Sequence, residues 1–429
     1  MIRPLADFLH TEAAGGVVLV AATIVAVVWA NSPWRDSYGD VWNTHVRLGV
    51  GTHELDLSAR EWVNDALMTI FFFIVGLEIK RELVEGELRD RRKASLPAIA
   101  AVGGMVVPAV LYTAINVGHA GARGWGIPMA TDIAMSIGVL SILGSRIDPA
   151  LKLFLLVLAI VDDIGAIVVI AVLYTDDIHL VPLLFVAAGL IAIAIMRVCG
   201  IRWVPLHLVL GIAVWLGLHE SGIHATLAGV VLGLMASTRP ARRADLADVA
   251  ELTNVSTAED AARTVDIARE SVSVVEWLEH VLHPWTSFAI VPLFALANAG
   301  VPLGAGALGD AFHSRITYGV VTGLVLGKVV GITTFAWLAA RLRLGTLPAR
   351  ATWRDVLAIG MIGGIGFTVS IFVSGLAFDT VARKDEAKVG ILVASLLAAA
   401  AGLALAWRAG RGTRATDPRG LATTVWPEG

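Results

Sequence analysis

The chain has 429 residues, of which 56% are hydrophobic and only 16% are charged. Soluble domains have about 25% charged residues, so this composition excludes an ordinary soluble enzyme and favours one membrane-embedded bundle. The formal net charge of −3 leaves no basic excess to neutralise a nucleic-acid backbone, which excludes nucleic acid as the partner. The one cysteine, Cys199, has no second cysteine for a disulfide or a metal motif and is interpreted as packing.

Hydropathy in windows of about 19 residues predicts twelve membrane-spanning helices. An even number places both chain ends on one side of the membrane. Loops on that side contain 24 Lys and Arg residues and loops on the other side contain 8. Because cytoplasmic loops are enriched in Lys and Arg, both termini are expected in the cytoplasm; the first span then serves as an uncleaved start-transfer helix. The predicted spans are Glu12–Ala30, Glu61–Lys80, Ser95–Val117, Trp125–Leu143, Pro149–Tyr174, Leu180–Cys199, Trp203–Leu218, Gly222–Ser237, Pro284–Leu303, Ile316–Ala340, Trp353–Phe378 and Lys388–Trp407.

Three segments outside the spans differ from simple connections. Apolar and polar residues alternate over Val46–Val50 and again over Leu55–Leu57, which predicts a β-hairpin within residues 44–58 outside the bilayer, with an irregular loop as the alternative. Residues 238–279 are polar, mixed in charge and long for a bundle connection, and are predicted as a cytoplasmic loop. Residues 1–409 are therefore one bundle, and the basic, Gly-rich residues 410–429 are expected to be a disordered tail.

Spans four and eleven contain matching interruptions, Gly126–Asp132 and Gly360–Thr368. Irregular backbone at membrane depth is tolerated only where it is buried in protein or lines a cavity. The interruptions lie at corresponding positions of spans three to five and ten to twelve, which predicts two inverted-topology repeats with the site at the breaks. Glycine packing in tight helices is the alternative for either one alone. The predicted fold is thus an all-α membrane protein with two interrupted helices and a small hairpin.

Four ionisable residues lie in otherwise apolar runs: Asp132, Asp162, Asp163 and Lys328. Each costs at least about 2.5 kcal/mol at a helix centre, so a functional role is the first hypothesis for each. Neighbours on a helix point about 100° apart, so Asp162 and Asp163 cannot both face one ligand. One carboxylate can exchange a cation and a proton while the other pairs with Lys328. A purely structural ion pair is the alternative, and it leaves the other acids unexplained.

Other motifs resemble known sites but have the wrong spacing. His219 and His224 are five residues apart instead of the four of a zinc-protease helix, and Gly323–Lys328 is one residue too short for a phosphate-binding loop. No metal or organic cofactor is therefore expected. An intramembrane aspartyl protease, with Asp132 and Asp162 or Asp163 as its dyad, is one alternative function. A symporter of organic anions on a similar inverted-repeat architecture is another, although three acids against one lysine suit a cation such as Na+, which prefers oxygen ligands.

Charged and titratable residues gather at the cytoplasmic end of span two and just before span nine. They are Glu78, Arg81 and Glu82 in the first segment and Glu279, His280 and His283 in the second. Solvated anchoring explains most charge at helix ends. Histidine, however, titrates nearest to neutral pH, so this cluster could couple internal pH to activity.

Seven segments closely resemble the NhaA-type bacterial Na+/H+ antiporters, which are themselves an example of inverted-repeat transporters. The segments extend over nearly the whole bundle. They are Phe72–Leu83, Ala130–Ala134, Ile160–Ala166, Ser221–Gly229, Leu278–Trp285, Phe294–Gly300 and Gly364–Phe372.

The resemblance implies electrogenic export of Na+ or Li+ in exchange for external H+ across the bacterial cytoplasmic membrane, regulated by pH. By position, Asp163 is implied as the main cation and proton site. The implied binding set also contains Asp162, Thr131 and Asp132, and Lys328 is implied to release Asp162 when the cation binds. Asp132 and Lys328 are implied to balance the dipoles of the facing half-helices. Glu78, Arg81, Glu82, Glu279, His280 and His283 match the family's pH-sensing entrance, and His224 matches a histidine linked to the pH response. The hairpin Val46–Leu57 is implied to form a homodimer contact within membrane lipid.

Overall fold

The computed structural model describes residues 2–50, 53–143, 148–175, 178–201, 203–238, 272–348 and 351–414. Most of the predicted loop 238–279 and of the predicted tail 410–429 lies outside these residues. The last helix, α20 (Val381–Arg414), continues beyond the predicted end of span twelve. Cys199 follows α8 (Leu180–Val198) and is exposed, so its interpretation as a packing residue is wrong. The last residue of α8, Val198, is exposed as well.

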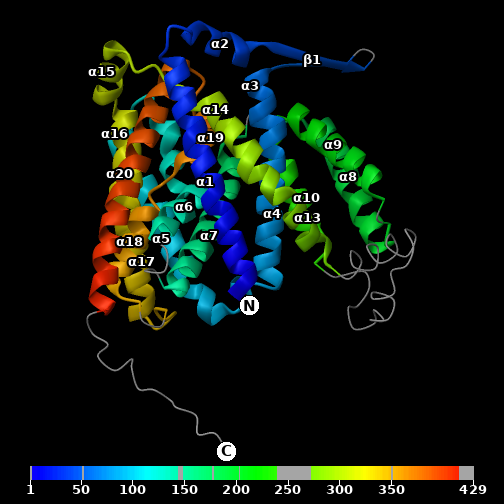
Figure 1. Cartoon of the computed structure of the whole chain (residues 1–429). Coiled ribbons are helices and arrows are strands. Elements are labelled where there is room, and N and C mark those ends of the chain that lie inside the picture. Colours follow the sequence, from blue (N-terminus) through cyan, green and yellow to red (C-terminus); the bar gives the residue numbers. More distant parts are fainter. Residues whose placement is uncertain are drawn as a thin grey trace, which may run out of the picture.

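The described residues form a bundle of mostly upright helices (Figure 1). Eight helices are long and apolar enough to cross a membrane, or nine when the bent pair α18 and α19 is one span. The start of α1 and the end of α20 lie at the same end of the bundle, and the hairpin lies at the opposite end with α2 and α15. The long helices are α1 (Ile2–Ala30), α3–η1–α4 (Ala59–Val84), α5 (Arg91–Asn116), α7 (Pro149–Leu173), α8, α13–η6–α14 (Val274–Asn298), α16–η7–α17 (Arg315–Arg341) and α20; shorter ones include α2 (Arg35–Asn43), α9 (Val204–Glu220), α10 (Leu227–Met235) and α15 (Ala305–His313).

The predicted β-hairpin is confirmed. Strands β1 (His45–Val50) and β2 (His53–Ser58) pair antiparallel, with Val46 opposite Leu57 and Leu48 opposite Leu55. The Asp56 carboxylate is 2.8 Å from His45 Nδ1 and accepts a hydrogen bond of 2.9 Å from Arg47 Nε. The hydrogen bond with His45, supported by the charge of Arg47, lowers the pKa of Asp56. Val46 and Leu48 stay exposed, which leaves an apolar strip on one face of the hairpin.

The backbone leaves the helical conformation at both predicted interruptions. In the first, η3 (Ala122–Met129) is a 3-10 helix, residues 130–132 are non-helical, and α6 (Ile133–Ile142) follows. In the second, α18 (Trp353–Ile362) and α19 (Phe367–Ala377) meet at an angle of 49°. The two breaks touch, since the backbone N–H of Asp132 donates to the carbonyl oxygen of Ile365 at 2.7 Å.

The predicted start of span nine at Pro284 is wrong. Helix α13 (Val274–Trp285) begins ten residues earlier, where the side chain of Ser273 accepts a hydrogen bond from the backbone N–H of Glu276 at 3.1 Å. Pro284 lies inside the helix and does not end it, since the chain continues through the π-helical turn η6 (Thr286–Ile290) into α14 (Val291–Asn298). Glu279, His280 and His283 therefore lie on the spanning helix itself and not on a loop before it.

Helix α17 (Lys328–Arg341) packs closely along α5, and glycines make this packing possible. A Cβ atom at Gly331 would overlap the carbonyl oxygen of Gly103, and one at Gly103 would overlap that of Gly331. Gly331 lies one turn after Lys328, so this contact also fixes the position of the lysine along the axis of the bundle.

We expect Gly331→Ala to destabilise the protein by about 1–3 kcal/mol, the usual cost of overpacking. Thermal unfolding of the purified protein in detergent micelles measures this change. Gly39→Ala in α2 is the matched control, because a Cβ there meets no atom within 4 Å. Equal unfolding temperatures for Gly331→Ala and the unmodified protein would show that the two helices can separate without cost.

Candidate functional site

Asp132 lies where the two interrupted segments cross, and its carboxylate accepts hydrogen bonds from the first turns of two helices. Its Oδ1 accepts a hydrogen bond from the backbone N–H of Met135 in the first turn of α6, at 2.9 Å. Its Oδ2 accepts from the backbone N–H of Thr368 in the first turn of α19, at 3.0 Å, and from the Thr368 hydroxyl at 2.5 Å. A carboxylate is favourable at a helix N-terminus, so one buried acid stabilises both half-helices.

Asp162 and Lys328 form a fully buried ion pair. The Lys328 Nζ atom lies 2.5 Å from Asp162 Oδ2, and both side chains are 0% exposed. The Thr131 hydroxyl lies 2.7 Å from the same carboxylate oxygen and 2.8 Å from the carbonyl oxygen of Gly363 at the second break. The other oxygen of Asp162, Oδ1, has no hydrogen-bond partner within the described residues.

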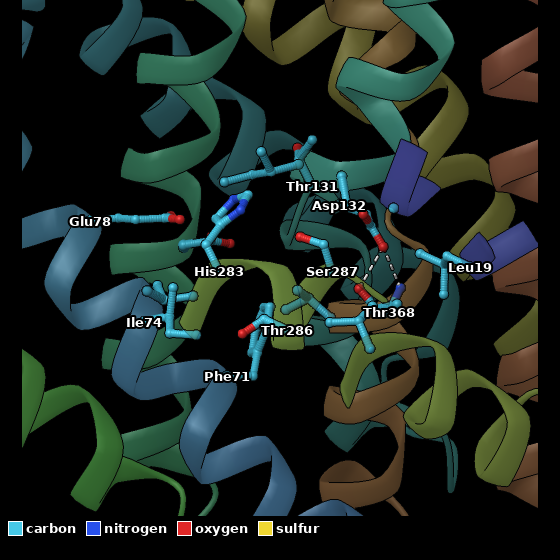
Figure 2. A pocket seen from close by; sticks show the side chains of 17 residues that line it. Leu19, Phe71, Ile74, Glu78, Thr131, Asp132, His283, Thr286, Ser287 and Thr368 are labelled. Atoms are coloured by element: carbon cyan, nitrogen blue, oxygen red, sulfur yellow. Dashed lines mark hydrogen bonds between the residues drawn. The ribbon is translucent and has the colours of Figure 1, made fainter. Parts of the chain in front are cut away.

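Asp163 points into a cavity of about 60 Å³ that does not include Asp162. The neighbouring carboxylates on α7 therefore face different surroundings, as the helical geometry predicts. Figure 2 shows the cavity between α4 (Met68–Val84), η6 and the two crossing segments, with Glu78 and His283 at one side and Thr368 and Asp132 at the other. Its polar lining consists of Glu78, Thr131, Asp132, Asp163, His283, Thr286, Ser287 and Thr368.

Three hydroxyl groups in this cavity donate their protons to the protein. Thr368 donates to Asp132, and Thr286 donates to the carbonyl oxygen of Leu282 at 3.2 Å. The one proton of Thr131 goes either to Asp162 or to Gly363. A hydroxyl has one proton and two lone pairs, so these groups can offer the cavity only acceptor oxygens. Such a lining suits a hard cation.

The predicted pH-sensing residues are only partly brought together. Arg81 Nη1 lies 2.5 Å from Glu279 Oε1, and Arg81 Nη2 lies 3.8 Å from Glu82 Oε1. Glu82 also accepts a hydrogen bond of 3.0 Å from the backbone N–H of Glu87. Glu78 and His283 line the cavity of Asp163 instead. His280 is exposed on α13.

His224 lies apart from that cluster. It lines a second, larger cavity of about 550 Å³ together with His219 and Asp65. Arg60, directly after the hairpin, and Lys388, near the start of α20, also line it, which places this cavity at the hairpin end of the bundle. The sequence positions of His224 and His283 could not reveal that they line different cavities.

Three polar residues of the site were not predicted from the sequence. Thr368 lies in a predicted interruption, and its place in the first turn of a half-helix is the signal that could have identified it as a polar contact. Thr286 and Ser287 follow Pro284 in an apolar helix, and nothing in their spacing marks them as cavity residues.

Comparison with known proteins shows the family of the chain. Residues 6–406 match the family model described as Na+/H+ antiporter 1. The chain is 45% identical to "Na(+)/H(+) antiporter NhaA 2" of Sorangium cellulosum, over 94% of this chain and 90% of that protein. It is 44% identical to "Na(+)/H(+) antiporter NhaA" of Rhodopirellula baltica, over 94% and 93%, and 42% identical to the protein of that name in Escherichia coli O139:H28, over 94% and 97%. The match over nearly the whole length shows that the chain belongs to the Na+/H+ antiporter 1 family.

Proposed function

We propose that this protein exchanges Na+ for H+ at Asp163. The observation that carries the proposal is the cavity of Asp163, where a buried carboxylate meets hydroxyl oxygens whose protons are directed elsewhere. A carboxylate can bind either a proton or a cation, and competition between the two couples their movements. The names of the curated relatives support the same exchange.

The ion pair of Asp162 with Lys328 adds a second step. When a cation binds beside Asp163, attraction to its charge draws Asp162 away from the lysine, and the freed ammonium can lose its proton. More than one proton would then move for each cation, so the exchange is electrogenic and the proton gradient can drive Na+ or Li+ out of the cell. Thr131 contacts Asp162 directly and takes part in this step, while Asp132 and Lys328 balance the charges of the half-helix ends.

The proposed architecture has twelve crossings of the membrane. Eight or nine of them are the long spans. The proposal assigns the others to three shorter parts of the chain: α9, α10 with the preceding turn, and η3 with α6. The segments around the two breaks form inverted repeats. The relatives are bacterial, so the protein lies in the bacterial inner membrane, and the distribution of Lys and Arg puts both termini in the cytoplasm. The cavity of Asp163 then opens toward the cytoplasm and the larger cavity toward the periplasm.

The ion network on α4 and α13 responds to cytoplasmic pH in this proposal. Arg81, Glu82 and Glu279 link the two helices, and Glu78 and His283 extend the network to Asp163. His224 acts from the periplasmic cavity, and His280 at the surface. The exposed apolar strip of the hairpin, with Val46 and Leu48, forms the contact of a homodimer.

The alternative functions fit less well. Asp162 is paired with a lysine and not with a second carboxylate, so it does not form the proton-sharing pair of an aspartyl protease. An organic anion would need hydrogen-bond donors, whereas Thr131, Thr286 and Thr368 direct their protons away from the cavity.

Purified protein in proteoliposomes with a preformed pH gradient tests the proposal. Addition of Na+ or Li+ is expected to release protons from the acidic lumen, and the rate is expected to change between about pH 6 and 9, the range around the titration of histidine. A membrane-potential dye measures electrogenicity in the same vesicles. Absence of a response to either cation at every pH would refute the proposal.

A further inference from the structure

We propose that Thr286 and Ser287 supply neutral oxygen ligands to the cation at Asp163 and thereby set the affinity for Na+ and Li+. The inference rests on the proposed function and assigns a specificity-determining role to a segment of α13–η6–α14. The ligand is a partly dehydrated monovalent hard cation.

Both residues are well placed for this role. Each side chain lines the cavity of Asp163, and each residue is only 6% exposed. Figure 2 shows them between His283 and the Asp132–Thr368 pair. They therefore lie on the path from the titratable residues at one side of the cavity to the crossing of the half-helices at the other.

The π-helical turn brings Thr286 and Ser287 closer together around the helix axis. Neighbouring side chains of an α-helix diverge by about 100°. The i→i+5 hydrogen bonds of a π-helix place more residues in each turn, which reduces that divergence somewhat. Segment η6 begins at Thr286 itself. Such turns are frequently found at functional sites.

The tight approach of α1 keeps the segment in position. A Cβ at Gly15 would lie 2.8 Å from the Cβ of Ser287, and one at Gly16 would lie 3.1 Å from the carbonyl oxygen of Ala134. These adjacent glycines let α1 contact η6 and α6 together. The side chains of Thr286 and Ser287 therefore cannot move away from Asp132, the N-cap of α6, unless α1 moves as well.

The cation needs these oxygens because few carboxylate oxygens are open to it in the cavity. Both oxygens of Asp132 accept hydrogen bonds from helix starts. Asp162 is paired with Lys328 and does not line the cavity, so it can approach the cation only after that pair opens. The cavity of about 60 Å³ has room for on the order of five waters and for fewer beside an ion. The Thr286 hydroxyl donates to Leu282 and keeps its lone pairs for the cavity.

Transport kinetics of Thr286→Val/Ser287→Ala in proteoliposomes test the inference. The apparent KM for Na+ is expected to rise roughly tenfold, equivalent to about 1.4 kcal/mol of binding, with little change in the maximal rate. The KM for Li+ is expected to rise more, because small hard cations lose water reluctantly. Thr286→Ser and Ser287→Thr keep the hydroxyls, and each is expected to retain the KM values of the unmodified protein.

Two matched controls separate ligation from structure. Thr322→Val changes a hydroxyl on another π-helical segment, η7 (Thr322–Gly327), and Ser374→Ala removes a buried hydroxyl that donates to Ile371; neither residue lines a cavity described above. Both should leave the KM unchanged. Unchanged KM values in the double variant, or a rise in Thr286→Ser equal to that in Thr286→Val, would overturn the inference while leaving exchange at Asp163 intact. If the double variant does not fold, the single variants decide by the same comparison. Loss of Na+-driven proton movement in the unmodified protein would instead refute the proposed function.

Discussion

Asp163→Asn is expected to reduce Na+-driven proton movement in proteoliposomes to the level of vesicles without protein. Asparagine is nearly isosteric but cannot bind or release a proton near neutral pH, and it offers the cation no negative charge. Asp163 is also the acid on α7 that faces the cavity, while its neighbour Asp162 is paired with Lys328. No second carboxylate of that helix is therefore free to replace it.

Asp379→Asn is the matched control, because Asp379 is exposed and lies beyond the end of α19. The Asp379→Asn variant should exchange Na+ for H+ at the rate of the unmodified protein. Proton movement on addition of Na+ by a correctly inserted Asp163→Asn variant would contradict the assignment of the site. Asp65 in the larger cavity would then be the next candidate.

Features that depend on unfavourable burial could be predicted from the sequence. A charge in a long apolar run is costly, and this single fact identified Asp132, Asp162, Asp163 and Lys328. Irregular backbone near Pro128 and Gly363 was predictable for a similar reason, because broken helices need special residues. The alternation around Val46 was sufficient for the hairpin.

Features that depend on tertiary packing could not be predicted. Each of the three π-helical segments in the described chain lies beside a cavity or the buried ion pair: η1 (Trp62–Leu67) contributes Asp65 to the larger cavity, η6 lines the cavity of Asp163, and η7 ends directly before Lys328. A π-helical turn differs from an α-helical one only in which carbonyl each N–H meets, so no local pattern reveals it. The same limitation caused the error at Pro284, where a residue typical of helix starts lies inside a helix.

The different roles of Asp162 and Asp163 could be predicted only in part from the sequence. The angle between adjacent helical residues required two different partners but did not say which acid faces Lys328. The choice depends on how α7 packs against its neighbours, for example against α5, where a Cβ at Gly165 would overlap the sulfur of Met105. The sequence therefore predicts the chemistry of the site more completely than its orientation.

Lys328→Ala is expected to lower the free energy of unfolding by about 3–5 kcal/mol, the usual cost of leaving a buried charge without its partner. The lysine and Asp162 are both 0% exposed. After removal of the lysine, Asp162 would have only the Thr131 hydroxyl, and Oδ1 already lacks a hydrogen-bond partner in the described chain. The carboxylate would then have to take up a proton, which should also alter the pH dependence of exchange.

Thermal unfolding in detergent at several pH values measures this effect, with Lys152→Ala, a lysine on α7 outside the ion pair, as the control. The double variant Lys328→Ala/Asp162→Asn separates the two contributions. It removes both charges, so it should recover more than half of the lost stability, because an unpaired buried charge costs more than a neutral polar group. A double variant as unstable as Lys328→Ala would mean that the lysine stabilises the bundle through packing of its buried side chain. The ion pair would then be a consequence of the fold, and its opening could not control proton release during exchange.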